Sequence, residues 1–255
     1  MAEILRVGCV KYLNARPLIY GWPGPVCFDH PSSLCQKLAR GDLDVALVSS
    51  FEFLRNPIYR IADGISICSD GPVYSVVVAH RGDIADVKEI SLDPASITSA
   101  NLLRCLMPEL NLNVLFLAEP NSAITNHRGR LLIGDQALHF RQRHEKEFKF
   151  WDLGRAWQEF FHLPFVYALW LIRQNVPAAG QISKRLRDLR DENLHRLQQL
   201  VESGEEFDTE FCARYYRDNI RFCFGEEEKK GLLKFAKLCA LHRLIPMPIP
   251  ELDLI

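Results

Sequence analysis

Residues 10–18 read Val-Lys-Tyr-Leu-Asn-Ala-Arg-Pro-Leu and give the clearest indication of how this chain folds. They follow an apolar segment, residues 4–10, which predicts a buried strand. Asn14 and Pro17 stand where the chain is expected to turn from that strand into a helix. In an open α/β sheet, ligands bind just beyond the carboxyl ends of the strands. Residues 10–18 are therefore expected to face a ligand.

The same pattern occurs twice more along the chain. Residues 44–48 form an apolar run that leads into Ser49 and Ser50, and residues 90–92 lead into a polar stretch that includes Thr98 and Ser99. Helix N-termini with serine or threonine present free N–H groups and the positive end of the helix dipole, which suits a carboxylate. An α/β chain with several such strand ends is expected to bind a small anion.

Length and charge set limits on the class of protein. The 255 residues suffice for one large domain or two smaller lobes. The net charge of -1 provides no basic surface for nucleic acid or for an acidic membrane. No apolar run approaches the ~18–20 residues that span a bilayer, and residues 1–10 lack the pattern of a secretory signal. We expect a globular cytoplasmic protein without nucleic-acid or membrane partners.

The eight cysteines are scattered among apolar neighbours and include no CxxC pair. An even number allows a set of disulfides, but without a secretory signal free buried thiols are the favoured interpretation. The eight histidines fall in no spacing typical of a metal site, and no glycine-rich phosphate loop is present. Neither a metal nor a nucleotide cofactor is expected.

Hydrophobic periodicity predicts alternating strands and helices followed by a helical C-terminal part. Strands are predicted at residues 4–10, 43–48, 74–80, 89–92, 113–117, 130–133 and 165–172. Helices are predicted at residues 31–40, 99–107, 182–201, 210–222 and 226–243. Ser32 or Ser33 is expected to cap the first helix and Asp208 the fourth. The first two strands are expected to be parallel, joined by a right-handed crossover.

This order predicts two α/β lobes, the second inserted into the first. Lobe I comprises residues 1–84 and 170–255, with the C-terminal helices as its outer layer, and lobe II comprises residues 85–169. The chain is expected to cross between the lobes near residues 81–88 and 163–173. The cleft between the lobes is the expected ligand site, and hinge closure is the expected motion.

An ordered set of motifs resembles the chorismate dehydratase family of the MqnA type. The set reads Tyr-Leu-Asn-Ala-x-Pro-Leu at 12–18, Asp-Val-Ala-Leu-Val-Ser-Ser at 44–50, Gly-Pro-Val-Tyr-Ser-Val at 71–76, Asp-Pro-x-Ser-x-Thr-Ser at 93–99, Ile-Gly-Asp-Gln-Ala-Leu at 133–138 and Trp-Asp-Leu-Gly-x-x-Trp at 151–157. The match runs from residue 4 to about residue 173. Lys11 and Arg16 are more basic than the residues expected at the flanks of the first motif.

The resemblance implies a two-lobed fold of the type II periplasmic-binding-protein class and a cytoplasmic, cofactor-independent lyase. Such an enzyme converts chorismate to 3-[(1-carboxyvinyl)oxy]benzoate and water, the first step of the futalosine route to menaquinone. Its partner is the small-molecule substrate, whereas a homodimer or contacts with downstream pathway enzymes stay open. The alternatives are a non-catalytic binding protein for a small carboxylate and the related 1,4-dihydroxy-6-naphthoate synthase.

Asn14 is the candidate catalytic residue, because its amide can donate to the leaving hydroxyl or a carboxylate and accept at the same time. The alternative role for Asn14 is to cap the following helix. Asp135 either orients groups in the cleft or is structural, since a carboxylate repels a dianion. The expected substrate-binding residues are Leu13, Ser49, Ser50, Ser75, Thr98, Ser99 and Asp135. No side chain stands out as a base, so the hypothesis is that the enolpyruvyl carboxylate of the substrate accepts the proton.

Overall fold

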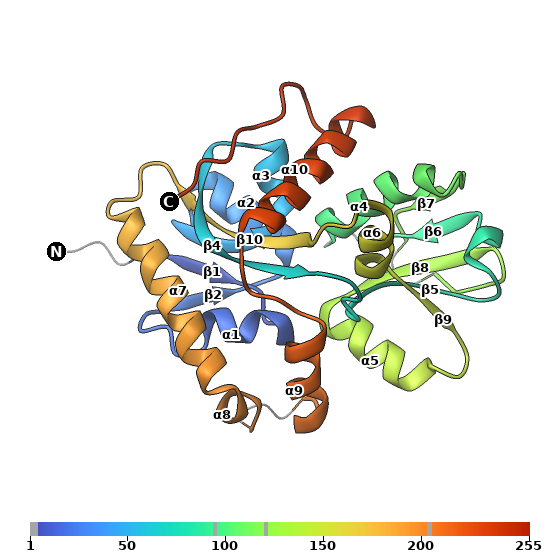
Figure 1. The fold of residues 1–255 in the computed structure, drawn as a ribbon, viewed down its shortest axis with the longest axis horizontal. Helices are drawn as coiled ribbons and strands as arrows, with labels where there is room; N and C mark the ends of the chain where they lie inside the picture. Colours follow the sequence, from blue (N-terminus) through green and yellow to red (C-terminus); the bar gives the residue numbers. More distant parts are fainter. Residues whose placement is uncertain (1–4, 94–95, 120–121, 203–205) are drawn as a thin grey trace.

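Two five-stranded sheets form the framework of the computed structural model, which describes residues 5–93, 96–119, 122–202 and 206–255. The strand order is β2-β1-β3-β10-β4 in the first sheet and β7-β6-β8-β5-β9 in the second. The sheets lie side by side in Figure 1 as the centres of two lobes, with the first sheet on the left. The structure thus has the two-lobed α/β architecture that was expected.

The first sheet combines parallel and antiparallel strands. Its strands are β1 (Val7–Cys9), β2 (Val26–Phe28), β3 (Val45–Ser49), β4 (Tyr59–Ser69) and β10 (Phe165–Arg173). Strand β1 is parallel to β2 and β3, which confirms the predicted parallel pair, whereas β10 is antiparallel to β3 and β4. The helices of this lobe are α1 (Arg16–Ile19), α2 (Pro31–Arg40), α3 (Ser50–Arg55), α7 (Ala179–His195), α8 (Leu197–Glu202), α9 (Thr209–Asp218) and α10 (Glu226–Leu241). In Figure 1, α1 and α7 lie on one side of this sheet and α2, α3 and α10 on the other.

The second sheet follows the same plan. Its strands are β5 (Val76–His80), β6 (Glu89–Ser91), β7 (Leu115–Leu117), β8 (Arg128–Ile133) and β9 (Lys149–Asp152). Its helices are α4 (Ile97–Glu109), α5 (Gly134–His144) and α6 (Leu153–Phe161). Short 3-10 turns lie at η1 (Leu13–Ala15) and η2 (Ile84–Asp86). Helix α5 begins directly at the end of β8, and α4 is the next helix after β6, as the sequence pattern predicts for anion-binding strand ends.

The pairing of β5 and β10 differs from the expected lobe boundaries at residues 84 and 169. Strand β5 pairs with β8 and β9 in the second sheet, and β10 pairs with β3 and β4 in the first. The chain therefore crosses between the sheets after β4, before the predicted residues 81–88, and again just before β10, at the start of the predicted residues 163–173. A continuous apolar strand fits either sheet, so its sequence alone does not specify its partner.

Several local predictions also needed correction. Strands β2, β4 and β9 were not predicted, and the predicted helix at residues 182–201 is divided into α7 and α8. Neither Ser32 nor Ser33 caps α2, because that helix begins at Pro31, and Ser33 Oγ instead donates to Asp29 Oδ2 at 2.6 Å. The predicted cap at Asp208 is confirmed, since its carboxylate accepts from the Phe211 N–H at 3.0 Å. Residues 1–4, with the start of the first predicted strand, and residues 94–95 of the fourth motif lie outside the described residues.

Aromatic packing ties the two lobes into one core. Trp157 on α6 lies 5.0 Å from Phe165 on β10, and Phe165 lies 5.0 Å from Phe235 on α10, measured between ring centroids.

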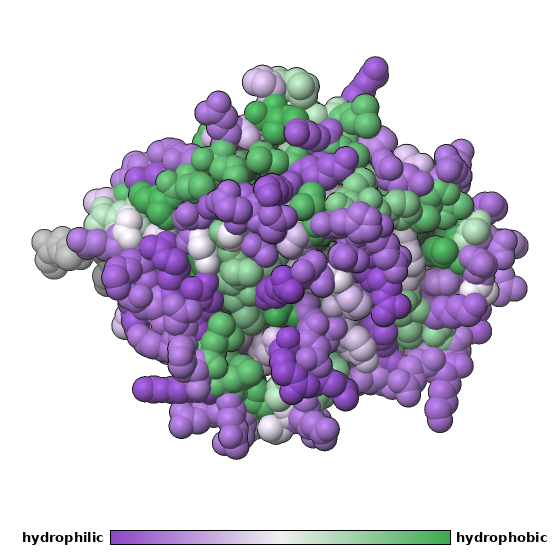
Figure 2. Space-filling model, viewed as in Figure 1, coloured by the Kyte–Doolittle hydropathy of each residue, from purple (hydrophilic) through white to green (hydrophobic). Residues whose placement is uncertain are grey.

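All eight cysteines are free thiols, and six are buried, with Cys27 and Cys223 in contact with solvent. Hydrophilic side chains cover most of the face drawn in Figure 2, with apolar residues in smaller patches. Among the helices of the described residues, none combines the length and apolar character needed to cross a bilayer.

Candidate active site

A cavity of about 80 Å³ lies between the two sheets, at the strand ends that the sequence singles out. Residues from both lobes line it, including the ends of β1 and β3, the start of α4 and the β8–α5 junction. Its polar lining residues are Tyr12, Asn14, Ser49, Ser96, Thr98, Ser99 and Tyr167. Every lining residue among those described is uncharged, so an anion in the cavity must be held by hydroxyl, amide and backbone N–H groups.

Two buried polar atoms at the cavity have no hydrogen-bond partner among the described residues: Asn14 Oδ1 and Ser96 Oγ. Ser96 is only 4% exposed and occupies the N-cap position of α4 without making a capping bond. A buried polar atom left unpaired costs about 1–3 kcal/mol. A ligand that hydrogen-bonds to these two atoms would recover that free energy. The sequence analysis missed Ser96, although its position before an apolar helix was a usable signal.

The orientation of the Asn14 amide is set by Tyr215. Burial raises the pKa of Tyr215, and side-chain hydrogen bonds with Ser75 and Asn14 oppose that rise. The Tyr215 hydroxyl donates to Ser75 Oγ at 2.6 Å, so it is available to accept from the Asn14 amide nitrogen. The Asn14 oxygen is then the atom left for a ligand, which agrees with its unpaired state.

Ser49 and Thr98 face each other across the two lobes, as the sequence analysis expected of residues in one site. Their hydroxyl oxygens lie 2.5 Å apart. Thr98 Oγ1 donates to the backbone carbonyl of Tyr167 at 3.1 Å, so Ser49 is the donor to Thr98. Ser99 follows on the first turn of α4 and also lines the cavity. This pair of hydroxyls thus connects the end of β3 to the start of α4.

Ser50 and Ser75 lie outside the cavity lining. Both are fully buried, and Ser50 Oγ donates to the Val166 carbonyl at 2.7 Å. Ser75 Oγ accepts from Tyr215, as described above. Their hydroxyls are therefore used within the protein, where they support the strands and helix around the cavity.

Leu13 and Asp135 form a second connection between the lobes. Asp135 Oδ1 accepts from the backbone N–H of Leu13 at 2.9 Å, and the Leu13 carbonyl accepts from the Tyr216 hydroxyl at 2.7 Å. The Leu13 side chain is buried, and neither residue lines the cavity. This geometry favours the structural alternative for Asp135: it positions the backbone immediately before Asn14.

Burial raises the pKa of Asp135 to about 6, and the Leu13 N–H opposes the rise. A carboxyl group whose pKa is raised on folding stabilises the fold in its protonated form, and that contribution is lost as pH rises through the folded pKa. We expect the free energy of unfolding to fall between pH 3 and 7 by on the order of 3 kcal/mol more in the native protein than in Asp135→Asn. Urea denaturation at a series of pH values measures this difference. Parallel curves for the two proteins would contradict it.

Tyr12 completes the contact between the lobes. Gly134 has φ +54°, and a Cβ built there would lie 3.0 Å from Tyr12 Cδ2. The ring therefore packs directly on the glycine at the start of α5. Burial, followed by the charge of Asp93, raises the pKa of Tyr12 to about 12, so its hydroxyl stays protonated as a donor at neutral pH. Lys11 and Arg16 line an open groove beside this residue, outside the cavity itself.

A family model described as menaquinone biosynthesis matches residues 5–241. The chain belongs to this family. Two relatives match this chain over most of their own length. A chorismate dehydratase from Thermus thermophilus is 28% identical over 96% of this chain and 98% of its own. A chorismate dehydratase from Campylobacter jejuni is 27% identical over 89% of this chain and 90% of its own.

Solved structures agree on the fold. A protein from Archaeoglobus fulgidus superimposes with a TM-score of 0.77 at 20% identity and covers 94% of this chain and 98% of its own. The periplasmic aliphatic sulphonate binding protein SsuA from Escherichia coli gives a TM-score of 0.62 at 15% identity, covering 98% and 90%. These similarities confirm the periplasmic-binding-protein-like fold of this family member. Family membership confirms the resemblance found in the sequence motifs.

Proposed function

We propose that this protein is a chorismate dehydratase that forms 3-[(1-carboxyvinyl)oxy]benzoate and water, the first step of the futalosine route to menaquinone. The observation that carries the proposal is the uncharged cavity between the lobes, where Asn14 Oδ1 and Ser96 Oγ are buried and unpaired. The names of the two relatives point to the same substrate. We place the protein in the cytoplasm and propose that it acts as a lyase without a cofactor.

The neutral hydroxyl and N–H donors of the cavity can bind a dianion and leave its carboxylates charged. The first turn of α4 offers backbone N–H groups and the positive end of a helix dipole, with Ser96 and Ser99 as hydroxyl donors. An anion at such a helix end gains up to ~2 kcal/mol when partly buried. One carboxylate of chorismate is assigned to this helix end.

Asn14 is assigned to the leaving hydroxyl. Chorismate carries that hydroxyl on the ring carbon next to the one that bears the enolpyruvyl ether. Loss of the hydroxyl and of the neighbouring hydrogen makes the ring aromatic, so the reaction is driven by its product. The protein then has to hold the reacting geometry, exclude water and assist proton transfer. Positioning of this kind lowers a barrier by ~7–11 kcal/mol at its ideal limit.

The proton acceptor is assigned to the substrate. Side chains with a pKa suited to a base are absent from the cavity lining, within the described residues. The enolpyruvyl carboxylate is attached close to the departing hydrogen and can accept it. The protein contributes uncharged surroundings, in which the substrate carboxylate does not compete with a basic side chain for the proton.

Incubation of the purified protein with chorismate tests the proposal. We expect the diene absorbance of chorismate to disappear and a meta-substituted benzoate to form over many turnovers. Chorismate that binds and is recovered unchanged would indicate a carboxylate-binding protein instead. Conversion of cyclic dehypoxanthine futalosine, with chorismate left unchanged, would indicate the naphthoate synthase.

Ser96→Ala is expected to raise the KM for chorismate about tenfold, because a hydrogen bond to a charged group contributes about 1.5–3 kcal/mol. Its stability should not fall, since the hydroxyl is unpaired in the structure. Steady-state kinetics and a thermal melt measure both effects. Ser122→Ala is the matched control, because Ser122 Oγ donates to exposed Glu119 and lies outside the cavity lining. An unchanged KM in Ser96→Ala would remove Ser96 from the site.

A further inference from the structure

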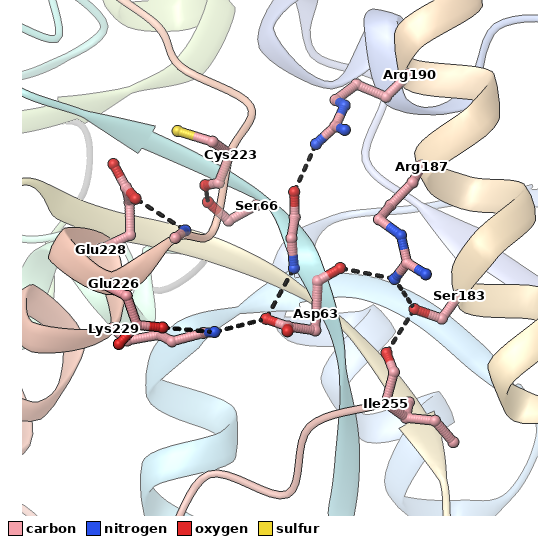
Figure 3. Close-up of polar contacts among 12 residues, drawn as sticks. Asp63, Ser66, Ser183, Arg187, Arg190, Cys223, Glu226, Glu228, Lys229 and Ile255 are labelled. Carbon is pink, nitrogen blue, oxygen red and sulfur yellow. Dashed lines mark hydrogen bonds and ion pairs between the residues drawn. The ribbon is translucent and has the colours of Figure 1, made fainter.

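A second cluster of reactive side chains lies away from the cavity, where α10 begins beside β4. Cys68 on β4, Cys223 in the segment before α10 and Glu228 in the first turn of α10 come together there. Their sulfur and carboxylate atoms all lie within 4.8 Å of one another. Figure 3 shows Cys223 and Glu228 beside Ser66 of β4. The dehydratase chemistry uses none of these residues.

Hydrogen bonds hold the three segments together. The backbone N–H of Cys68 donates to the Arg221 carbonyl at 3.0 Å, and the Arg221 N–H donates back to Cys68 at 2.8 Å. Ser66 Oγ donates to the Cys223 carbonyl at 2.5 Å. Glu228 Oε2 accepts from the Gly225 N–H at 2.9 Å, as part of the capping box of α10. The two sulfur atoms and the carboxylate are thus positioned by main-chain contacts, before any ligand binds.

The charges around the cluster leave the carboxylate of Glu228 available to a cation. Glu228 is only 6% exposed. The neighbouring Lys229 ammonium lies 3.0 Å from Asp63 and 3.3 Å from Glu226 (Figure 3). Arg221 pairs with Asp70 at 3.0 Å. Both basic side chains that flank the cluster are therefore directed toward other acids.

We propose that Cys68, Cys223 and Glu228 bind a single thiophilic divalent cation of the Zn²⁺ class, with water as the fourth ligand. Thiolate and carboxylate are ordinary Zn²⁺ ligands in tetrahedral sites, whereas Mg²⁺ and Ca²⁺ prefer oxygen ligands alone. Zn–S bonds of about 2.3 Å place two sulfur ligands roughly 3.8 Å apart, within the spread of the cluster. Binding releases the two thiol protons to solvent and leaves Glu228 Oε2 on its capping bond.

The Zn²⁺ site would strengthen the attachment of α10 to the sheet. Cys68 stands between Ile67, which lines the cavity, and Ser69, where β4 ends before the chain crosses to the second lobe. A cation that binds the folded protein in preference to the unfolded chain raises its melting temperature. The expected consequence of Zn²⁺ is thus higher stability of the segment at residues 219–228.

Titration of the fully reduced, full-length protein with Co²⁺ and then Zn²⁺ tests the site. We expect one Co²⁺ per chain, a thiolate-to-cobalt absorption band in the near ultraviolet, and loss of that band when Zn²⁺ is added. Cys223→Ser should weaken Zn²⁺ binding at least tenfold. Glu228→Gln should also weaken it at least tenfold while its amide oxygen keeps the capping bond. Glu226→Gln on the same turn and Cys27→Ser are the matched controls and should bind as the native protein does.

Cys68 is buried, so its replacement risks unfolding the chain, and a measurement on the native protein avoids that problem. Zn²⁺ should slow the alkylation of Cys223 by iodoacetamide at least tenfold and leave that of Cys27 unchanged. Failure of the reduced protein to bind Co²⁺ or Zn²⁺, or unchanged binding in Cys223→Ser, would overturn the proposal. A Cys68–Cys223 disulfide in a protein that binds no metal when reduced would overturn it as well. None of these readouts depends on chorismate turnover, so they stand apart from the proposed dehydratase.

Discussion

Asn14→Ala is expected to lower kcat for chorismate dehydration by about 10²-fold, the loss typical of misplacing a reacting group, because Asn14 Oδ1 accepts from the leaving hydroxyl and holds it in position. The fold should be retained, because Asn14 Oδ1 has no partner among the described residues and the substitution removes one hydrogen bond, that between the Asn14 amide nitrogen and the Tyr215 hydroxyl. Chorismate should still bind, since the hydroxyls of α4 remain. Rapid-mixing kinetics, a binding titration and a thermal melt separate the three effects.

Asn56→Ala is the matched control. Asn56 lies after α3 and contacts the Tyr59 hydroxyl at 3.3 Å, outside the cavity lining. Its replacement should leave kcat unchanged. If Asn14→Ala retained full activity, Asn14 would be the helix cap that the sequence analysis held as its alternative role, and the chemistry would need another residue.

Gly154→Ala is expected to lower the free energy of unfolding by about 2–3 kcal/mol, at the upper end of the effects of overpacking. A Cβ at this position would lie 2.5 Å from the Gly71 carbonyl oxygen and 2.7 Å from each of the hydroxyl oxygens of Ser69 and Tyr167. Ser69 Oγ and the Tyr167 hydroxyl already hydrogen-bond to each other at 3.1 Å. These groups lie where the chain first crosses between the lobes, so turnover should fall together with stability. Urea denaturation measures the change in stability.

Gly180→Ala provides the comparison at a helix position with space for a methyl group. The nearest atom to a Cβ there is Ile255 Cγ1, at 4.0 Å. Alanine in place of glycine in α7 should leave stability unchanged or raise it by up to about 1 kcal/mol. Equal stability of Gly154→Ala and the native protein would show that the crossing can expand, contrary to the tight packing described above.

Residues on the strand-end motifs were predictable because motif and local structure coincide there. Ser49 ends β3, Thr98 and Ser99 lie on the first turn of the helix that follows β6, and the structure brings all three to the cavity with Asn14. Ser50, the first residue of α3, and Ser75, which immediately precedes β5, use their hydroxyls in hydrogen bonds with protein partners. Adjacent residues at a strand end face opposite directions, and the sequence does not say which one faces the ligand.

The lobe assignment of strands was less predictable than their existence. Strands β5 and β10 were predicted as strands, but their antiparallel partners come from segments far away in sequence. Strand β4 was not predicted, because Asp63 and Gly64 interrupt its apolar pattern and read as a turn. In the structure Gly64 adopts φ +75°, and the register between β4 and β10 shifts between Ile61 and Ser66, the stretch that contains this glycine. Pairing with β10 thus overrides the local turn signal.

The long-range hydrogen bonds of α9 also lay beyond the sequence analysis. Tyr215 and Tyr216 on α9 support Ser75 and the Leu13 backbone, across about 140 and 203 residues of sequence. The helix was predicted from its periodicity and its cap at Asp208, but periodicity gives only the apolar face. The partners of a tyrosine hydroxyl depend on tertiary packing, which the local pattern does not encode.

The pH dependence of kcat for the loss of water from chorismate tests most directly the claim that an uncharged cavity lets the substrate act as its own base. Between pH 7 and 9 both substrate carboxylates and Asp135 are ionised, and burial keeps Tyr12 protonated with a pKa of about 12. The account predicts a kcat that stays constant within twofold across this range, with the benzoate as product. A kcat that follows a single ionisation with an apparent pKa between 7 and 8.5 would contradict it, because a protein group would then control the proton transfer.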